Sequence, residues 1–197
     1  MRSKHNYINQ EDFARILDAI PRLHIRKWLD VDVQMLFKIL YWCALRPEEG
    51  IRLKKEDFHL ADREIYLGKT KTEGIGYAPI PDPFIPELES YLAAKPDGEL
   101  LPGLTYNTLY PWLIKLGKML QIEAWTTDQS ESHEKTKGHI FRKSIGKDML
   151  FGVHGPALKD VAVISKQLRH KKPSMTFDKY LNANIEAVKE AWSNAGE

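Results

Sequence analysis

The chain has 197 residues, 43% of them hydrophobic and 28% charged, which fits one globular domain with a filled core and excludes disordered and fibrous classes. A single cysteine, Cys43, excludes an internal disulfide, and the lack of a cysteine cluster argues against a structural zinc site. The formal net charge of +2 identifies no partner by itself. Neither a signal peptide nor a membrane-spanning stretch is recognisable, so we expect a cytoplasmic protein, or a nuclear one if the source is a eukaryote.

Helical patterns dominate the chain. Asn9 or Gln10 is expected to cap the first helix, which Pro21 closes, and Pro47 suits the first position of the third. The predicted helices cover residues 11–20, 33–45, 47–53, 86–94, 107–120, 137–151, 157–168 and 175–181, and a last amphipathic helix carries Ile185, Val188 and Trp192. Residues 126–136 are polar and predict a surface loop.

Two short strands interrupt the helices, at residues 64–67 and 76–80, with a glycine-containing turn between them. Pro79 predicts that the second strand lies at an edge, because proline has no N–H to donate to a neighbouring strand. The sequence therefore predicts a mainly α fold with a small antiparallel β-ribbon, an α+β architecture.

Charge is unevenly distributed along the chain. Residues 1–100 hold 15 Lys and Arg against 17 Asp and Glu, whereas residues 132–172 hold ten against three, with four histidines besides. A local basic excess of this kind is typical of a surface that contacts phosphates.

Three segments carry the polar groups of a candidate active site. The first is Ala44-Leu45-Arg46-Pro47-Glu48-Glu49, the second His139-Ile140-Phe141-Arg142, and the third Leu168-Arg169-His170, which precedes Tyr180. Tyr180 is the only tyrosine after His170. In this order and at these separations, the residues resemble the tyrosine recombinase (phage-type integrase) family, whose signature is Arg, Lys, His-x-x-Arg, His or Trp, and Tyr. The resemblance covers nearly the whole chain.

The resemblance implies the catalytic-domain fold of the DNA breaking-rejoining enzymes. It also implies a catalytic lysine on the β-ribbon, roughly 25 residues after Arg46. Lys71 fits that place, eight residues before Pro79, and Lys69 is the alternative.

The chemistry implied is cleavage and rejoining of DNA through a 3′-phosphotyrosyl bond to Tyr180, without metal, cofactor or ATP. Arg46 and Arg142 each offer a fixed fork of donors to phosphate oxygens, which lysine does not. His139 is expected to act in proton transfer, His170 to donate a hydrogen bond to the phosphate, and Lys71 to protonate the leaving oxygen. Glu49 is assigned a supporting role, orienting Arg46 or the histidines.

Double-stranded DNA is the expected partner, in a nucleoid-associated protein that is monomeric in free solution and tetrameric on DNA. Residues expected to contact flanking phosphates are Lys69, Lys135, Lys137, Lys143, Arg169, Lys171 and Lys172. We expect one catalytic domain over residues 1–197, with a core at about 9–182 and a C-terminal helix or tail at 183–197. The N-terminal core-binding domain of the family is expected to be absent.

Two other functions remain open from the sequence. A type IB topoisomerase uses the same residues on a similar fold but relaxes DNA without exchanging strands between duplexes. A catalytically silent DNA-binding module would keep the fold and form no covalent adduct with DNA.

Overall fold

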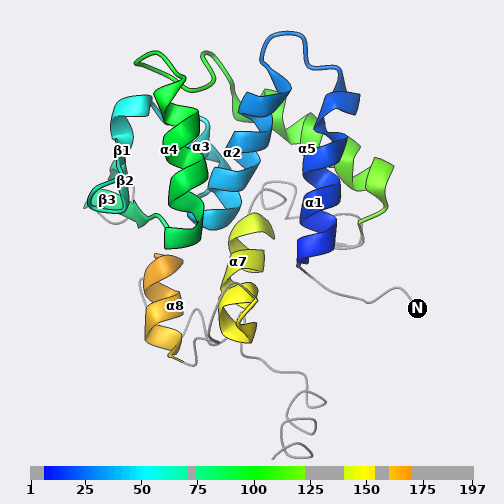
Figure 1. The fold of residues 1–197 in the computed structure, drawn as a ribbon. Helices are drawn as coiled ribbons and strands as arrows, with labels where there is room; N and C mark the ends of the chain where they lie inside the picture. The colour runs from blue at the N-terminus through cyan, green and yellow to red at the C-terminus, as the bar shows by residue number, and fades with distance from the viewer. Residues whose placement is uncertain (1–6, 71–73, 123–139, 154–159, 170–197) are drawn as a thin grey trace, which may run out of the picture. The chain divides into compact units, whose positions relative to one another are not determined.

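The computed structural model of the chain describes residues 7–70, 74–122, 140–153 and 160–169 (Figure 1). Two compact units are distinguished, Met1–Ile145 and Gly146–Glu197, and the boundary falls inside one helix. Within the described residues, no helix is both long and apolar enough to cross a membrane. The elements are mainly helices with one small antiparallel sheet, as the sequence predicts.

The first helix, α1, spans Gln10–Ala19 and begins at the expected cap. The Asn9 side chain accepts a hydrogen bond from the backbone N–H of Asp12 at 2.8 Å, which satisfies one of the donors that a helix N-terminus leaves open. Phe13 and Ile16 face the core. The α-helix ends before Pro21, and a short 3₁₀ helix, η1, continues over Ile20–Leu23.

The second helix, α2, spans Asp30–Trp42 and is the centre of the first unit, with apolar side chains buried on most of its circumference. The sequence predicted it over 33–45, three residues too late at both ends. The Gln34 side-chain amide donates to the carbonyl of Leu17 on α1 at 2.9 Å, and Lys38 forms an ion pair with Glu87. These contacts hold α2 between its neighbours.

A three-stranded antiparallel sheet follows the four-residue helix α3 (Pro47–Gly50) and the 3₁₀ turn η2 (Lys55–Asp57). Its order is β1 (Phe58–His59), β2 (Glu64–Thr70) and β3 (Gly74–Pro79). The strand β1 was not predicted. Pro79 lies on the edge strand, so that prediction is confirmed.

The β2–β3 ribbon is irregular between Tyr66 and Lys69, where the register shifts. Gly68 has a φ of +69° in this interval, a conformation that an L side chain rarely adopts. The register resumes with Lys69 opposite Ile75 and Thr70 opposite Gly74.

Two helices complete the first half of the fold after the turn η3 (Asp82–Phe84): α4 (Ile85–Ala93) and α5 (Tyr106–Leu120). Both were predicted to within one residue. Leu109, Leu113 and Leu116 bury one face of α5, as expected for residues at helical spacing. The Arg15 guanidinium on α1 donates to the carbonyl of Leu120 at 2.8 Å, which ties the end of α5 to α1.

The remaining described helices are α7 (Ile140–Phe151) and α8 (Val161–Gln167). Each lies within a segment predicted to be helical. The Asp160 side chain caps α8 by accepting from the N–H of Ala162 at 2.8 Å. The predicted helices after residue 170 and the predicted loop 126–136 lie outside the described residues.

Candidate active site

A tight turn at the end of α2 immediately precedes Arg46, the first predicted catalytic residue. Ala44 adopts the left-handed conformation with a φ of +51°, and it is fully buried. The N–H of Leu45 donates to the carbonyl of Leu40, and the N–H of Ala44 to that of Tyr41, both at 3.2 Å. This pair of bonds is the Schellman arrangement that ends many helices, usually with glycine at the left-handed position. It reverses the chain and leads directly into Arg46.

Arg46 stands at the N-terminus of α3 and is held there by Glu49. One carboxylate oxygen of Glu49, Oε2, accepts the backbone N–H of Arg46 at 2.7 Å, and the other, Oε1, accepts from the guanidinium Nη1 at 2.9 Å. The Arg46 side chain is 32% exposed and that of Glu49 13%. A cation at a helix N-terminus is electrostatically disfavoured, and the carboxylate beside it offsets that effect. The guanidinium therefore has a fixed orientation and an open side.

Arg142 approaches the same turn from a distant part of the sequence. It lies on α7, is 4% exposed, and its Nη1 donates to the carbonyl of Ala44 at 3.3 Å. The two residues are 98 positions apart, and Ala44 is two residues before Arg46. The fold thus brings Arg142 to the turn that leads into Arg46 and Glu49; Arg142 is buried and Arg46 is partly exposed. Such a pair suits a ligand with a delocalised negative charge.

The start of α7 is fixed by aromatic packing. Phe141 is fully buried, and its ring packs edge to face on two others. The ring centroids are 6.1 Å apart for Phe13 of α1 and 5.3 Å apart for Phe37 of α2. Because Phe141 precedes Arg142, these contacts determine which side of α7 meets the core. Arg142 is carried to the turn by a helix that the core holds in place.

Tyr106, in the first turn of α5, is close enough to α3 for the charge of Glu48 to act on its hydroxyl. Burial, then the charge of Glu48 and that of Tyr110, raise the pKa of Tyr106. The Tyr106 and Tyr110 rings pack with centroids 5.9 Å apart. No motif in the sequence points to Tyr106, because a tyrosine at helical spacing from another is an ordinary packing pattern.

Several predicted site residues lie outside the described residues. They are Lys71, His139, His170 and Tyr180 among the catalytic candidates, and Lys135, Lys137, Lys171 and Lys172 among the DNA-contacting ones. Lys69 is on β2, and Lys143 is half-buried on α7. Arg169 is half-buried in the second unit, directly after α8, with a φ of +48°. Their roles stay predictions.

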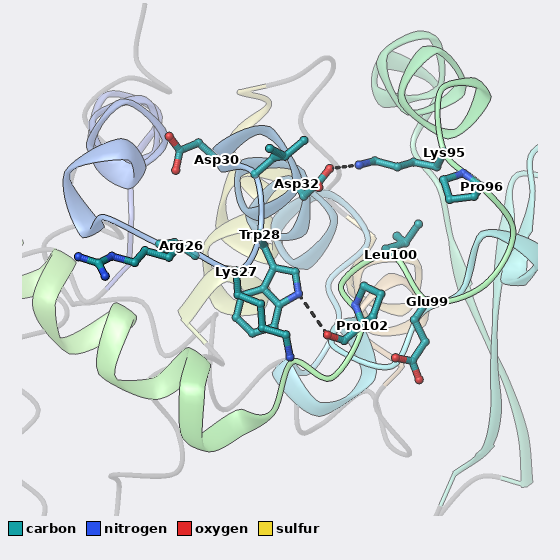
Figure 2. A pocket seen from close by; sticks show the side chains of 12 residues that line it. Arg26, Lys27, Trp28, Asp30, Asp32, Lys95, Pro96, Glu99, Leu100 and Pro102 are labelled. Carbon is teal, nitrogen blue, oxygen red and sulfur yellow. Dashed lines mark hydrogen bonds and ion pairs between the residues drawn. The ribbon is translucent and has the colours of Figure 1, made fainter.

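A separate hollow of about 470 Å³ lies at the other end of α2 (Figure 2). Trp28 donates from its ring nitrogen to the Pro102 carbonyl at 3.3 Å, and Asp32 pairs with Lys95. Three cationic and three acidic side chains line the hollow: Arg26, Lys27 and Lys95, and Asp30, Asp32 and Glu99. Because these charges balance, the hollow lacks the positive excess that a phosphate backbone requires.

Comparison with known protein families gives one match over most of the chain. The model of the phage integrase family matches residues 6–187. Among curated proteins, no sequence matches. The matched segment contains every residue of the predicted catalytic set.

Similar solved structures are recombinases and integrases. XerA recombinase superposes with a TM-score of 0.63 at 18% identity, over 96% of this chain and 64% of that one. XerH site-specific recombinase, in its post-cleavage complex with a palindromic difH substrate, gives 0.68 at 18%, over 98% and 53%. The catalytic domain of bacteriophage HP1 integrase gives 0.59 at 16%, over 93% of both chains. At these identities the likeness establishes the fold, and the prediction of a tyrosine recombinase catalytic-domain fold is confirmed.

The extent of these matches differs. The chain spans about two thirds or less of the length of XerA and XerH but nearly all of the HP1 catalytic domain. The shared part therefore corresponds in size to a catalytic domain.

Proposed function

Because the chain belongs to the phage integrase family, we propose that it is a site-specific DNA recombinase that cuts and rejoins DNA strands through a covalent bond to Tyr180. The observation that carries the proposal is the meeting of Arg46, Glu49 and Arg142 at one turn. A phosphodiester under attack develops charge on its non-bridging oxygens, and two oriented guanidinium groups stabilise that charge.

The cleavage step divides its work among the predicted residues. The Tyr180 oxygen attacks phosphorus, the bond to the 5′ oxygen breaks, and the Tyr180 proton passes to His139. Lys71, or Lys69 as the alternative, protonates the leaving 5′ oxygen. His170 donates a hydrogen bond to the phosphate, and Glu49 keeps Arg46 oriented.

Rejoining reverses the same step. A 5′-hydroxyl attacks the 3′-phosphotyrosyl bond and Tyr180 leaves, so the energy of the broken phosphodiester is retained and ATP is not consumed. The arginines, the lysine and the histidines supply the charge stabilisation and proton transfers that the reaction needs. We propose that the reaction proceeds without a metal ion.

DNA is the partner in several similar structures. XerH is bound to its difH substrate, and the Tn1549 transposon integrase is in complex with transposon end DNA and with circular intermediate DNA. We propose double-stranded DNA as the partner of this chain, contacted by the basic residues predicted above. Assembly as a tetramer on DNA, a monomeric state in free solution and association with the nucleoid belong to the same proposal, as does one catalytic domain with a tail after residue 182.

The experiment is a covalent-trapping assay in EDTA. The protein is incubated with a pool of nicked suicide duplexes of randomised sequence, and adducts are recovered on denaturing gels and sequenced. We expect an adduct that Tyr180→Phe abolishes and that Arg142→Lys reduces by at least about 100-fold, because lysine lacks the guanidinium fork. No adduct with any duplex would support the silent DNA-binding module.

A second arm separates recombination from relaxation. Duplexes that carry the recovered site are tested for strand exchange between two molecules and for relaxation of a supercoiled plasmid. Exchanged strands are expected for a recombinase. Relaxation alone would identify a type IB topoisomerase and contradict the proposal.

A further inference from the structure

Ser144 is a buried hydroxyl in the helix that carries Arg142. It lies two residues after Arg142, and its exposed fraction is 0%. Its Oγ accepts a hydrogen bond from the backbone N–H of Ile8 at 2.8 Å and donates one to the carbonyl of Ile140 at 2.8 Å. A serine hydroxyl has one proton to donate, so both of its functions as donor and acceptor are used inside the protein.

The hydrogen bond between Ser144 and Ile8 joins two residues that are far apart in the sequence. Ile8 belongs to the segment that precedes α1, and it is also fully buried. A backbone N–H in an apolar surrounding needs an acceptor, and Ser144 supplies it. The segment before α1 is therefore fastened to α7 through a side chain, 136 residues away in sequence.

The first five residues of α7 contact three separate parts of the fold. Phe141 packs on rings of α1 and α2, Arg142 bonds the turn before α3, and Ser144 bonds the segment before α1. Contacts between rings depend weakly on direction, whereas a hydrogen bond weakens steeply when its distance or its angle changes. The Ser144 contact, at 2.8 Å, therefore adds a directional restraint to the packing of the rings.

We propose that Ser144 is a positioning residue for DNA cleavage, because it sets the placement of the α7 turn that presents Arg142 and follows His139. The inference rests on the proposed function. Ser144 does not touch the phosphate. It acts through the helix, by fixing Arg142 against the Ala44 carbonyl and by holding the carbonyl of Ile140, the residue next to His139.

The first test compares Ser144→Ala with Ile39→Val, using the full chain. Ile39 is fully buried on α2, and the loss of one methylene there typically costs a free energy of unfolding similar to that of one hydrogen bond. The single-turnover rate of adduct formation and the Kd for the duplex are measured for both. We expect Ser144→Ala to slow cleavage by about 10-fold to 100-fold with Kd changed less than about twofold, and Ile39→Val to leave both within about twofold.

A second variant removes the same hydrogen bond from its other end. Nonsense suppression with the α-hydroxy analogue of isoleucine replaces the Ile8 amide by an ester, which deletes the N–H and leaves the side chain. This variant should also slow cleavage, and by no more than Ser144→Ala, which deletes the hydrogen bond to the Ile140 carbonyl as well. The combined variant should lose no more than Ser144→Ala alone, because the hydrogen bond between Ile8 and Ser144 is already absent from that variant.

The outcomes separate the two proposals. Equal cleavage rates for Ser144→Ala and Ile39→Val, or additive losses in the combined variant, would overturn the role of Ser144. If the wild-type protein forms no adduct, the proposed function fails, and the positioning claim is read from NMR of the free protein. Ser144→Ala should then broaden or shift the Arg142 guanidinium resonance while Ile39→Val leaves it unchanged; an unchanged resonance in both would overturn the claim.

Discussion

Glu49 holds Arg46 at two points at once, with Oε2 on the backbone N–H at 2.7 Å and Oε1 on the guanidinium at 2.9 Å. The same carboxylate therefore begins a helix and aims a side chain. Because α3 is only four residues long, its start and the direction of Arg46 are set by a single group. Loss of that group should be felt both in stability and in cleavage.

Replacing Glu49 separates these two effects. Glu49→Gln keeps an oxygen for the backbone N–H but loses the ion pair, so we expect at most about 1 kcal/mol of destabilisation together with at least about tenfold slower cleavage. Glu49→Ala also removes the cap and should cost about 1 kcal/mol more. Urea unfolding and single-turnover cleavage measure the two quantities. Glu48→Gln, an exposed change on the same helix, is the control, and wild-type cleavage by Glu49→Ala would contradict the assigned role.

Because Ala44 is buried and its backbone is left-handed, we expect position 44 to accept only very small side chains without a loss of stability. Ala44→Gly relieves the cost of the left-handed conformation, about 1 kcal/mol, and loses a buried methyl of similar value, so the free energy of unfolding should stay within about 0.5 kcal/mol. Ala44→Val adds strain and volume and should destabilise by more than about 2 kcal/mol. Chemical denaturation of both variants checks the order, and an Ala44→Val protein as stable as Ala44→Gly would refute it.

Tyr91 predicts a loss of stability at alkaline pH. Its hydroxyl donates to Asp32 at 3.0 Å, and burial, then the charge and hydrogen bond of Asp32, raise the pKa of Tyr91 above its ordinary value. The hydroxyl of Tyr91 therefore loses its proton at a lower pH in the unfolded chain than in the folded one. The contribution of this hydrogen bond to the free energy of unfolding is complete below about pH 10 and is lost as the pH rises further.

Tyr91→Phe tests that dependence. At pH 8 it should destabilise the protein by about 1.5–3 kcal/mol, and its urea midpoint should fall less than that of the wild type between pH 9 and 11. Tyr77→Phe, on the exposed part of β3, is the matched control and should change stability at pH 8 by less than about 0.5 kcal/mol. Parallel pH curves for wild type and Tyr91→Phe would exclude this source of alkaline sensitivity.

The hollow at the start of α2 should be dispensable for cleavage. The ring nitrogen of Trp28 donates a hydrogen bond to the Pro102 carbonyl, and its ring packs edge to face on Trp112 with centroids 5.7 Å apart. Trp28→Ala should therefore cost about 1–3 kcal/mol, less than a fully buried aromatic residue, with single-turnover cleavage within about twofold of wild type. Trp112→Phe retains a ring for the contact and is the matched control. A large cleavage defect in a folded Trp28→Ala protein would connect the hollow to the reaction.

Local signals in the sequence predicted most of the described helices. Asn9 was expected as a cap because its side chain can accept a backbone N–H, and it does so. The start of α2 was missed by three residues because its first turn, from Asp30, is partly polar and the apolar pattern begins at Val33. Its end was missed because Ala44 occupies a position where glycine is the usual signal.

The site was predictable only in part, for a physical reason. Arg46 and Arg142 became candidates through the resemblance to the family signature, and Glu49 became a candidate partner of Arg46 or of the histidines in the same way. The contact of Arg142 with Ala44, and that of Ser144 with Ile8, join residues 98 and 136 positions apart. Such contacts depend on the packing of whole helices, which no local pattern encodes.

The single thiol of the chain gives access to the dynamics of this turn. Cys43 is fully buried and immediately precedes Ala44, and its N–H still bonds the carbonyl of Ile39 at 3.0 Å. A thiol reagent reaches Cys43 only when the end of α2 opens. Since the chain has no other cysteine, the labelling rate of the wild-type protein measures how often the turn before Arg46 opens. DNA that binds to Arg46 and Arg142 should slow that labelling.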